Sequence, residues 1–465
     1  MKCSARIGRG VWMMLVAAGL VLASASAARG QSPQEVALRE LRGEIQRLRE
    51  EVAALRDEMR RARQPAAPPA TAEPSGAQAQ AAQAQAALEM VQAQVAEHSQ
   101  TKVESSTRLP VRIFGAILSS TYFNSGEANW LDNPNIADAA PSGGLPRGSF
   151  SSTLRQSRMG ATIEGPQIGG LRARGFVAMD FFGGIPNFQT GPVIGLPRLL
   201  YAFLRLEGER TAFVAGQDHM IFAPANPTSL ASFAFPGLYR SGNLYLRVPQ
   251  LRVERNVAAG RNSEIQLAGG ILAPVAGDFV GGAFEFVPPN LGGERSRQPG
   301  LQGRLGWRSR AGGIAESGGV EFGISGHTSS VRQTTDSTRS WGTAIDFDAR
   351  WRKFGLGGEW FAGRALAAFG GSLGQAAKSA GGFVEARLRA TPRLEFNAGY
   401  GIDSLFDLAA TPAPLERNSS VFGNFIYQFT PELATSFEYR WLSTKPGAAQ
   451  ARRNSHLHLV FAYRF

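Results

Sequence analysis

The sequence predicts an all-β fold, a 16-stranded antiparallel transmembrane β-barrel, preceded by an N-terminal α-helical coiled coil. Three observations predict it. After Pro110, apolar and polar side chains alternate in many short segments, and successive strand residues point to opposite faces of a sheet. The links between these segments are short and long in turn. The chain also ends on such a segment, HLHLVFAYRF, whose residues of one parity are strongly apolar.

Residues 1–28 have the pattern of a secretory signal peptide. Lys2, Arg6 and Arg9 precede the apolar run VWMMLVAAGLVL, and the small residues ASASAA follow it. This order is typical of a signal that is cleaved, here near Ala27 or Ala28. The alternative is an uncleaved anchor helix, although twelve apolar residues are few for a membrane span. Cleavage removes the one cysteine, so the mature chain has no thiol for disulfides, metal binding or catalysis.

Residues 33–63 show the heptad pattern of a coiled coil, with apolar a and d positions: Leu38, Leu41, Ile45, Leu48, Val52, Leu55 and Met59. Glutamates at g positions are followed five residues on by arginines at e positions, as in a parallel coil: Glu44, Glu51 and Glu58 with Arg49, Arg56 and Arg63. A single surface helix is the alternative, and the pattern alone does not fix the number of chains. Residues 64–108, rich in Ala, Gln and Pro, are predicted to be a tether.

Residues 109–465 are predicted to form the barrel. Sixteen segments are interpreted as strands: 111–122, 154–164, 170–181, 198–207, 211–217, 245–255, 263–273, 300–309, 319–328, 339–352, 355–364, 380–390, 393–402, 417–429, 432–443 and 455–465. Short links such as GPQIG, EGER, KF and TP alternate with long ones: 123–153, 182–197, 218–244 and 274–299. Tight turns at one end and long loops at the other are typical of an outer-membrane barrel.

The two faces of the predicted strands differ as a membrane barrel requires. Along 432–443, Phe437, Tyr439 and Trp441 alternate with Glu438 and Arg440. A wet lumen accepts the charged face, while the aromatic face meets lipid. The final strand is therefore expected to close the barrel, and sixteen strands leave an aqueous channel.

The composition argues against other classes of protein. The net charge of +12 comes from scattered arginines without a basic cluster, so no nucleic-acid binding is predicted. His456 and His458 share one strand face, but no Glu or Asp lies beside them in the sequence to orient them. No catalytic, metal or cofactor site is predicted, and the chain is not expected to be an enzyme. A plugged barrel that anchors the coil remains an alternative.

The terminal YRF, with Tyr463 and Phe465, resembles the signal that the barrel insertion machinery recognises, and RIFGAILSSTYF in the first strand is generically porin-like. With a signal peptide, coil, tether and sixteen strands in this order, the chain resembles the DcaP-like trimeric porins. The resemblance implies a homotrimer through coil and barrel in the outer membrane of a Gram-negative bacterium. There it would contact lipid and lipopolysaccharide, with the coiled coil in the periplasm. The implied activity is uptake of small anions such as dicarboxylates. Phosphate-selective and general, weakly selective porins are the alternatives.

Charged side chains of the lumen parity are the candidate solute path. Arg158, Arg247 and Arg440 lie near mid-height or above, where a guanidinium can bind a carboxylate bidentately. Lumen acids oppose this preference, or else form a lattice of paired charges: Asp346, Asp348 and Glu438. Arginines at the short-turn ends are expected to form a basic periplasmic vestibule, or to contact headgroups and turns: Arg172, Arg174, Arg205, Arg387 and Arg389, with Arg350, Arg352 and Arg464.

The link after the fifth strand, DHMIFAPANPTSLASFAFPGLYRSGN, is unusually apolar for a loop in water. It is predicted to fold into the lumen and to narrow it, because its aromatic residues need a surface to pack on. Asp218, His219 and Arg240 at its ends are expected to border the constriction. Alternatively, the aromatic residues cover a subunit interface.

Overall fold

The structure is a computed structural model that describes residues 110–185, 191–275, 292–310, 318–332, 337–406, 415–447 and 449–465. The predicted signal peptide, coiled coil and tether lie outside these residues. No helix among the described residues is long and apolar enough to cross a membrane.

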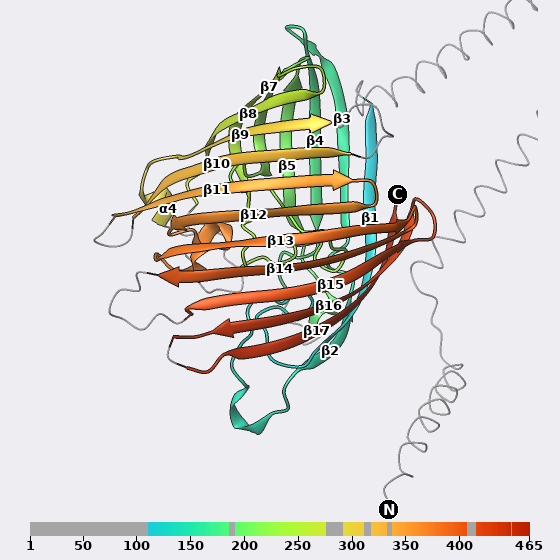
Figure 1. The fold of residues 1–465 in the computed structure, drawn as a ribbon, viewed down its shortest axis with the longest axis vertical. Coiled ribbons are helices and arrows are strands. Elements are labelled where there is room, and N and C mark those ends of the chain that lie inside the picture. Colours follow the sequence, from blue (N-terminus) through green and yellow to red (C-terminus); the bar gives the residue numbers. More distant parts are fainter. Residues whose placement is uncertain are drawn as a thin grey trace, which may run out of the picture. The chain divides into compact units, whose positions relative to one another are not determined.

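Antiparallel strands make up one closed sheet. They are β1 (Val111–Asn124), β2 (Ser149–Thr153), β3 (Arg158–Ile168), β4 (Leu171–Asp180), β5 (Arg198–Glu207), β6 (Thr211–His219), β7 (Arg247–Ala258), β8 (Ser263–Leu272), β9 (Gly300–Arg310), β10 (Gly319–Arg332), β11 (Ser337–Trp351), β12 (Phe354–Arg364), β13 (Lys378–Thr391), β14 (Leu394–Phe406), β15 (Arg417–Gln428), β16 (Leu433–Lys445) and β17 (Arg452–Arg464). Short helices lie between strands: η1 (Ser142–Gly144), η2 (Gly191–Val193), α4 (Gly292–Arg295), η3 (Ala367–Phe369) and η4 (Ser372–Gly374). Strands β10 to β17 lie side by side in sequence order (Figure 1).

The seventeen labelled strands form a 16-stranded barrel, because β2 and β3 act as one wall strand. β1 pairs with β2 along its second half and with β3 along its first half. A break at 154–157 separates the two segments. The predicted strand 154–164 is therefore corrected: β3 begins at Arg158, runs on to Ile168 and contains a bulge between Glu164 and Gln167. The turn that follows is Gly169–Gly170, both with positive φ, a conformation that glycine adopts readily.

The barrel closes between its first and last strands. β1 pairs with β17 from Ala116 opposite Arg464 to Asn124 opposite His456. Phe465 continues the pairing, exchanging two backbone hydrogen bonds of 2.9 and 3.1 Å with Gly115. The Phe465 ring lies over Gly115, where a Cβ atom would collide with it. The predicted closure by the final strand is confirmed.

The faces of β17 are as different as the alternation predicts. Leu457, Phe461 and Tyr463 are 37%, 49% and 50% exposed on the outside, while His456 and His458 on the inside are each 1% exposed. So little exposure on the inner face means that something covers this part of the interior wall. At Val460 and Ala462 of β17 the covering segment is the link between β6 and β7.

Candidate functional site

We call the segment from Met220 to Leu246, between β6 and β7, the inner loop. Its backbone N–H groups donate to side chains on the inner wall, one wall strand after another. Gln302 Oε1 of β9 accepts from Ile221 and Phe222 at 2.9 and 3.0 Å. Further acceptors are Ser325 of β10, Glu359 of β12, Glu385 of β13 and Gln156 of the β2–β3 break. The inner loop therefore lies along the inner wall, held there by hydrogen bonds from its backbone to wall side chains.

Apolar residues of the inner loop pack on the same wall. Met220 and Phe222 form a buried cluster with Phe361 of β12 and with Leu366 and Phe369 in the link that follows β12. A second cluster joins the inner loop to the closure region: Leu230 and Ala231 with Ala116, Leu118, Ala434, Val460 and Ala462. The predicted folding of this loop into the lumen is confirmed. Its aromatic residues Phe222 and Phe233 contact the loop's own barrel, so they do not cover an outer interface.

The inner loop approaches the wall too closely for side chains at one point. Gly242 has φ of 96°, and a Cβ atom there would collide with the carbonyl oxygen of Gly382 in β13. Leu238 and Arg240, which are not glycines, also have positive φ, at 60° and 61°. Such backbone conformations persist where the surroundings impose them, as the anchoring of this loop does.

Many lumen charges are paired within the wall. Arg440 is 3% exposed, forms an ion pair of 2.7 Å with Glu438, and donates to the Pro134 carbonyl in the first long loop. Its guanidinium thus holds the first long loop and the inner loop and does not face open water. Arg440 is therefore not part of the solute path, contrary to the prediction. Asp346 pairs with Arg304. These pairs are the lattice that the sequence left as an alternative.

Arg158 and Arg247 differ from Arg440, because neither has a carboxylate partner among the described residues. Arg158 Nη2 donates to the carbonyl oxygen of Phe233 in the inner loop at 2.9 Å, and its Cζ lies 4.3 Å from that ring's centroid. Arg247 Cζ lies 4.7 and 4.8 Å from the ring centroids of Tyr201 and Tyr245. The two guanidinium groups repel each other. We call them the arginine pair.

The aromatic neighbours do not neutralise these two charges, and Asp180, opposite Arg158 on β4, is already ion-paired with Arg198. A ring face attracts a guanidinium without neutralising it. Burial raises the pKa of the Tyr245 phenol, which therefore stays neutral beside Arg247. Both arginines are only half-buried, so part of each side chain remains accessible. The arrangement offers positive charge next to the inner loop.

The three predicted constriction residues at the ends of the inner loop, Asp218, His219 and Arg240, have different surroundings. The His219 ring packs 4.9 Å from that of Tyr245 and so lies beside Arg247. Asp218 forms an ion pair with Arg252 of β7, so its charge is compensated. Arg240 lies over the ring of Tyr239 at 5.8 Å, at the far end of the inner loop. Of the three, only His219 adjoins the arginine pair.

We call the end of the barrel that carries the short turns between strands the turn end. The predicted vestibule residues lie there. Most pair with carboxylates there: Arg174 with Glu164 at 2.9 Å, Arg205 with Glu254 at 2.8 Å, Arg389 with Glu395 at 3.6 Å, and Arg387 with Asp348. Arg172 is exposed, without an ion pair among the described residues. This end carries mixed charge, with arginine in excess on one side.

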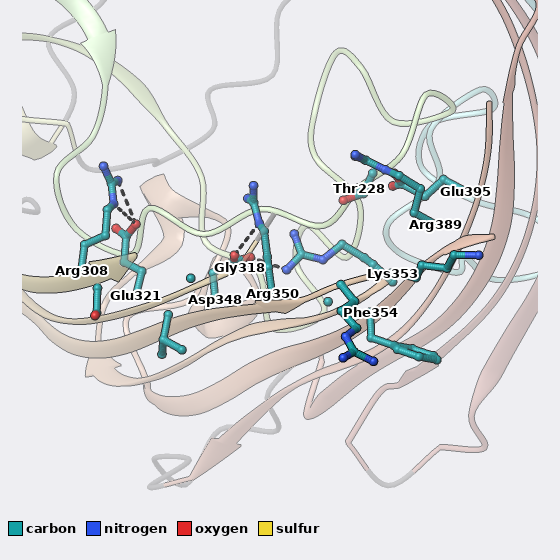
Figure 2. Close-up of a pocket in the computed structure, with 16 residues that line it drawn as sticks. Thr228, Arg308, Gly318, Glu321, Asp348, Arg350, Lys353, Phe354, Arg389 and Glu395 are labelled. Carbon is teal, nitrogen blue, oxygen red and sulfur yellow. Dashed lines mark hydrogen bonds and ion pairs between the residues drawn. The ribbon is translucent and has the colours of Figure 1, made fainter. Parts of the chain in front are cut away.

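That side contains a cavity of about 560 Å³, which we call the turn-end cavity. Figure 2 shows its charged side chains in a row along the wall, from the Arg308–Glu321 pair past Asp348 to the Arg389–Glu395 pair. Thr228 of the inner loop also lines it, so the cavity extends from the turn end to the inner loop.

Comparison with solved structures finds this barrel among outer-membrane channels. The crystal structure of the outer membrane channel DcaP of Acinetobacter baumannii matches with a TM-score of 0.58 and 16% identity, over 77% of this chain and 97% of that chain. An anion-selective porin from Comamonas acidovorans matches with a TM-score of 0.50 and 11% identity, over 77% and 100%. The fold is that of a porin. No protein-family model and no curated protein matches the sequence.

The resemblance to the DcaP-like porins is thus confirmed for the fold, which is found in Gram-negative outer membranes. Within this porin barrel, sequence reasoning missed the amides that hold the inner loop, Gln156 and Gln302, and the tyrosines beside Arg247. The lumen parity of Gln302 on β9 was a usable signal, but the loop that it contacts is remote in sequence. The described residues contain no group of three or more His, Cys, Asp or Glu able to hold a metal ion.

Proposed function

We propose that the chain forms a water-filled outer-membrane channel for passive uptake of small hydrophilic anions such as dicarboxylates. The observation that carries the proposal is the arginine pair, two half-buried guanidinium groups beside the inner loop without a carboxylate partner among the described residues. Uncompensated charge at a narrowed point attracts counter-ions and repels ions of its own sign. Two guanidinium groups also suit a solute with two carboxylates.

The proposed assembly of the channel proceeds by secretion, insertion into the outer membrane and association of three chains. Residues 1–28 are removed as a signal peptide, the insertion machinery reads Tyr463 and Phe465, and the barrel settles among lipid and lipopolysaccharide. Three chains associate through the coil of residues 33–63 and through their barrels, and the turn end faces the periplasm. Insertion into a planar bilayer in groups of three conductance steps would support the trimer.

The test of anion preference is the reversal potential of purified protein in a planar bilayer under a KCl gradient. We expect the native channel to favour chloride, and the double variant Arg158→Gln/Arg247→Gln to lose most of that preference. Arg453→Gln is the control for loss of positive charge outside the lumen, because Arg453 is exposed and shares the outward parity of Leu457 on β17. An unchanged reversal potential in the double variant would contradict the role of the pair.

One alternative is favoured by a specific observation. The inner loop is anchored along much of the wall, which suits a plugged barrel that anchors a periplasmic coil. A plugged barrel gives no conductance steps at any voltage. A general, weakly selective porin gives steps with a reversal potential near zero, and a phosphate-preferring one is blocked by phosphate more readily than by succinate.

A further inference from the structure

The turn-end cavity is separate from the arginine pair, and its lining includes neither Arg158 nor Arg247. Its volume of about 560 Å³ lies within the range of roughly 300–1,000 Å³ that is usual for small-molecule sites. Because Thr228 of the inner loop forms part of its lining, a solute that has passed the inner loop reaches this cavity next.

Basic side chains outnumber acidic ones in the lining. The basic residues are Arg308, Arg350, Arg352, Lys353, Arg387 and Arg389, and the acidic ones are Glu321, Asp348 and Glu395. The acids are also shared. Asp348 binds both Arg350, at 2.8 Å, and Arg387. Arg387 also lies 3.7 Å from Glu385, so the surplus of positive charge comes from the lining cations that have no ion pair.

The turn between β11 and β12 adds two more cations. Arg352 and Lys353 have no ion pair among the described residues. Arg352 Cζ lies 5.2 Å from the Trp351 ring centroid, and Lys353 Nζ is 3.3 Å from the carbonyl oxygen of Ala390. Arg352 also has φ of 52°, a backbone conformation that glycine adopts with less strain. The turn thus places two cations at the edge of the cavity.

We propose that the turn-end cavity is a second anion-binding site, which takes a solute with at least two carboxylate groups, such as a tricarboxylate. The cations extend along the wall in a row instead of meeting at one point (Figure 2), so a solute with separated charges contacts more of them than a monovalent anion does. This inference rests on the proposed function, because it extends the path of the same solutes beyond the arginine pair.

The experiment is isothermal titration of tricarballylate, with acetate for comparison, into the detergent-solubilised full-length protein at low ionic strength. We expect tricarballylate to bind more tightly than acetate, because low salt preserves interactions between accessible charges. The double variant Arg352→Gln/Lys353→Gln is expected to bind tricarballylate at least tenfold more weakly. Arg389→Gln, at another point of the lining, is expected to weaken binding several-fold and serves as a second variant if the turn variant does not fold.

Two controls separate this site from the channel's selectivity. Arg393→Gln removes an exposed cation from the neighbouring turn, between β13 and β14, that does not line the cavity, and binding should be unchanged. Arg158→Gln/Arg247→Gln should bind tricarballylate within twofold of the native protein. Native affinity in both lining variants, or loss of binding on removal of the arginine pair, would overturn the second site. Neither result would alter the native reversal potential, which tests the channel independently.

Discussion

Replacing Glu385 by alanine removes the carboxylate that holds the middle of the inner loop. Glu385 is 2% exposed; one of its oxygens accepts from the Thr228 N–H at 2.6 Å and the other from the Thr228 hydroxyl at 3.2 Å. Hydrogen bonds to charged groups contribute about 1.5–3 kcal/mol each. Because the hydroxyl bond is long, we expect the free energy of local opening to fall by about 3 kcal/mol in total.

A loss of about 3 kcal/mol corresponds to a roughly hundredfold larger opening constant. Amide hydrogen exchange measures this constant where the loop closes again much faster than an exposed amide exchanges. We therefore expect the amides of residues 225–235 to exchange about a hundredfold faster in Glu385→Ala, while those of β15 keep their native rates.

Glu385→Gln is the matched control, because its amide oxygen can still accept from the Thr228 N–H. Its exchange is expected to lie much closer to native than that of the alanine variant. Equal exchange in the native protein and in Glu385→Ala would refute the reasoning. Packing at Leu230 and Ala231 would then hold the loop without the carboxylate.

Other substitutions test separate features. Gly242→Ala is expected to displace the inner loop from the wall, because the added methyl group collides with Gly382, and so to change the single-channel conductance. A native conductance would contradict this. Phe465→Ala is expected to reduce the fraction of folded barrel, scored by the gel shift between unheated and boiled samples, since the ring packs over the first strand. Asp132→Ala leaves the buried Arg155 guanidinium unpaired, at a cost of about 3–5 kcal/mol. The first long loop should then be cleaved faster by trypsin than in Asp132→Asn. The preference for chloride should shrink between 0.1 M and 1 M salt, where the screening length falls from about 10 to 3 Å; a constant preference would point to selection by size.

The strand positions follow from the sequence because one period governs them all. A wall with lipid outside and polar groups inside repeats every two residues, so β16 and β17 are readable from their alternation alone. The break at 154–157 is not readable in this way, because it is stabilised by contacts with remote loops. Gln156, for example, accepts from Phe233, which lies 77 residues away.

Charge compensation was the least predictable part of the site. Parity places Arg158 and Arg440 on the inside. The predicted lumen parity of Arg247 is wrong, because Arg247 shares the parity of the exposed Leu251 and Val253 on β7 and reaches Tyr201 and Tyr245 from the start of that strand. Only register and loop placement show which arginine meets a carboxylate. Arg440 has Glu438 two residues away on the same strand face. Arg158 and Arg247 instead meet aromatic rings, and Tyr245, one of those next to Arg247, comes from the inner loop. The sequence thus indicates which strand positions carry charged side chains, but not which of these side chains form ion pairs.

The anchoring of the inner loop also bears on how the chain folds. Its partners lie progressively farther along the chain, at sequence separations of 81 for Gln302, 102 for Ser325, 157 for Glu385 and 209 for Glu438. Contacts of such separation form late, because each must first close a long stretch of chain. We therefore expect the loop to be fully anchored only after β16 is in place, so that the channel reaches its final width late in folding. Newly inserted barrels should pass through a short-lived, wider and less selective state before they mature.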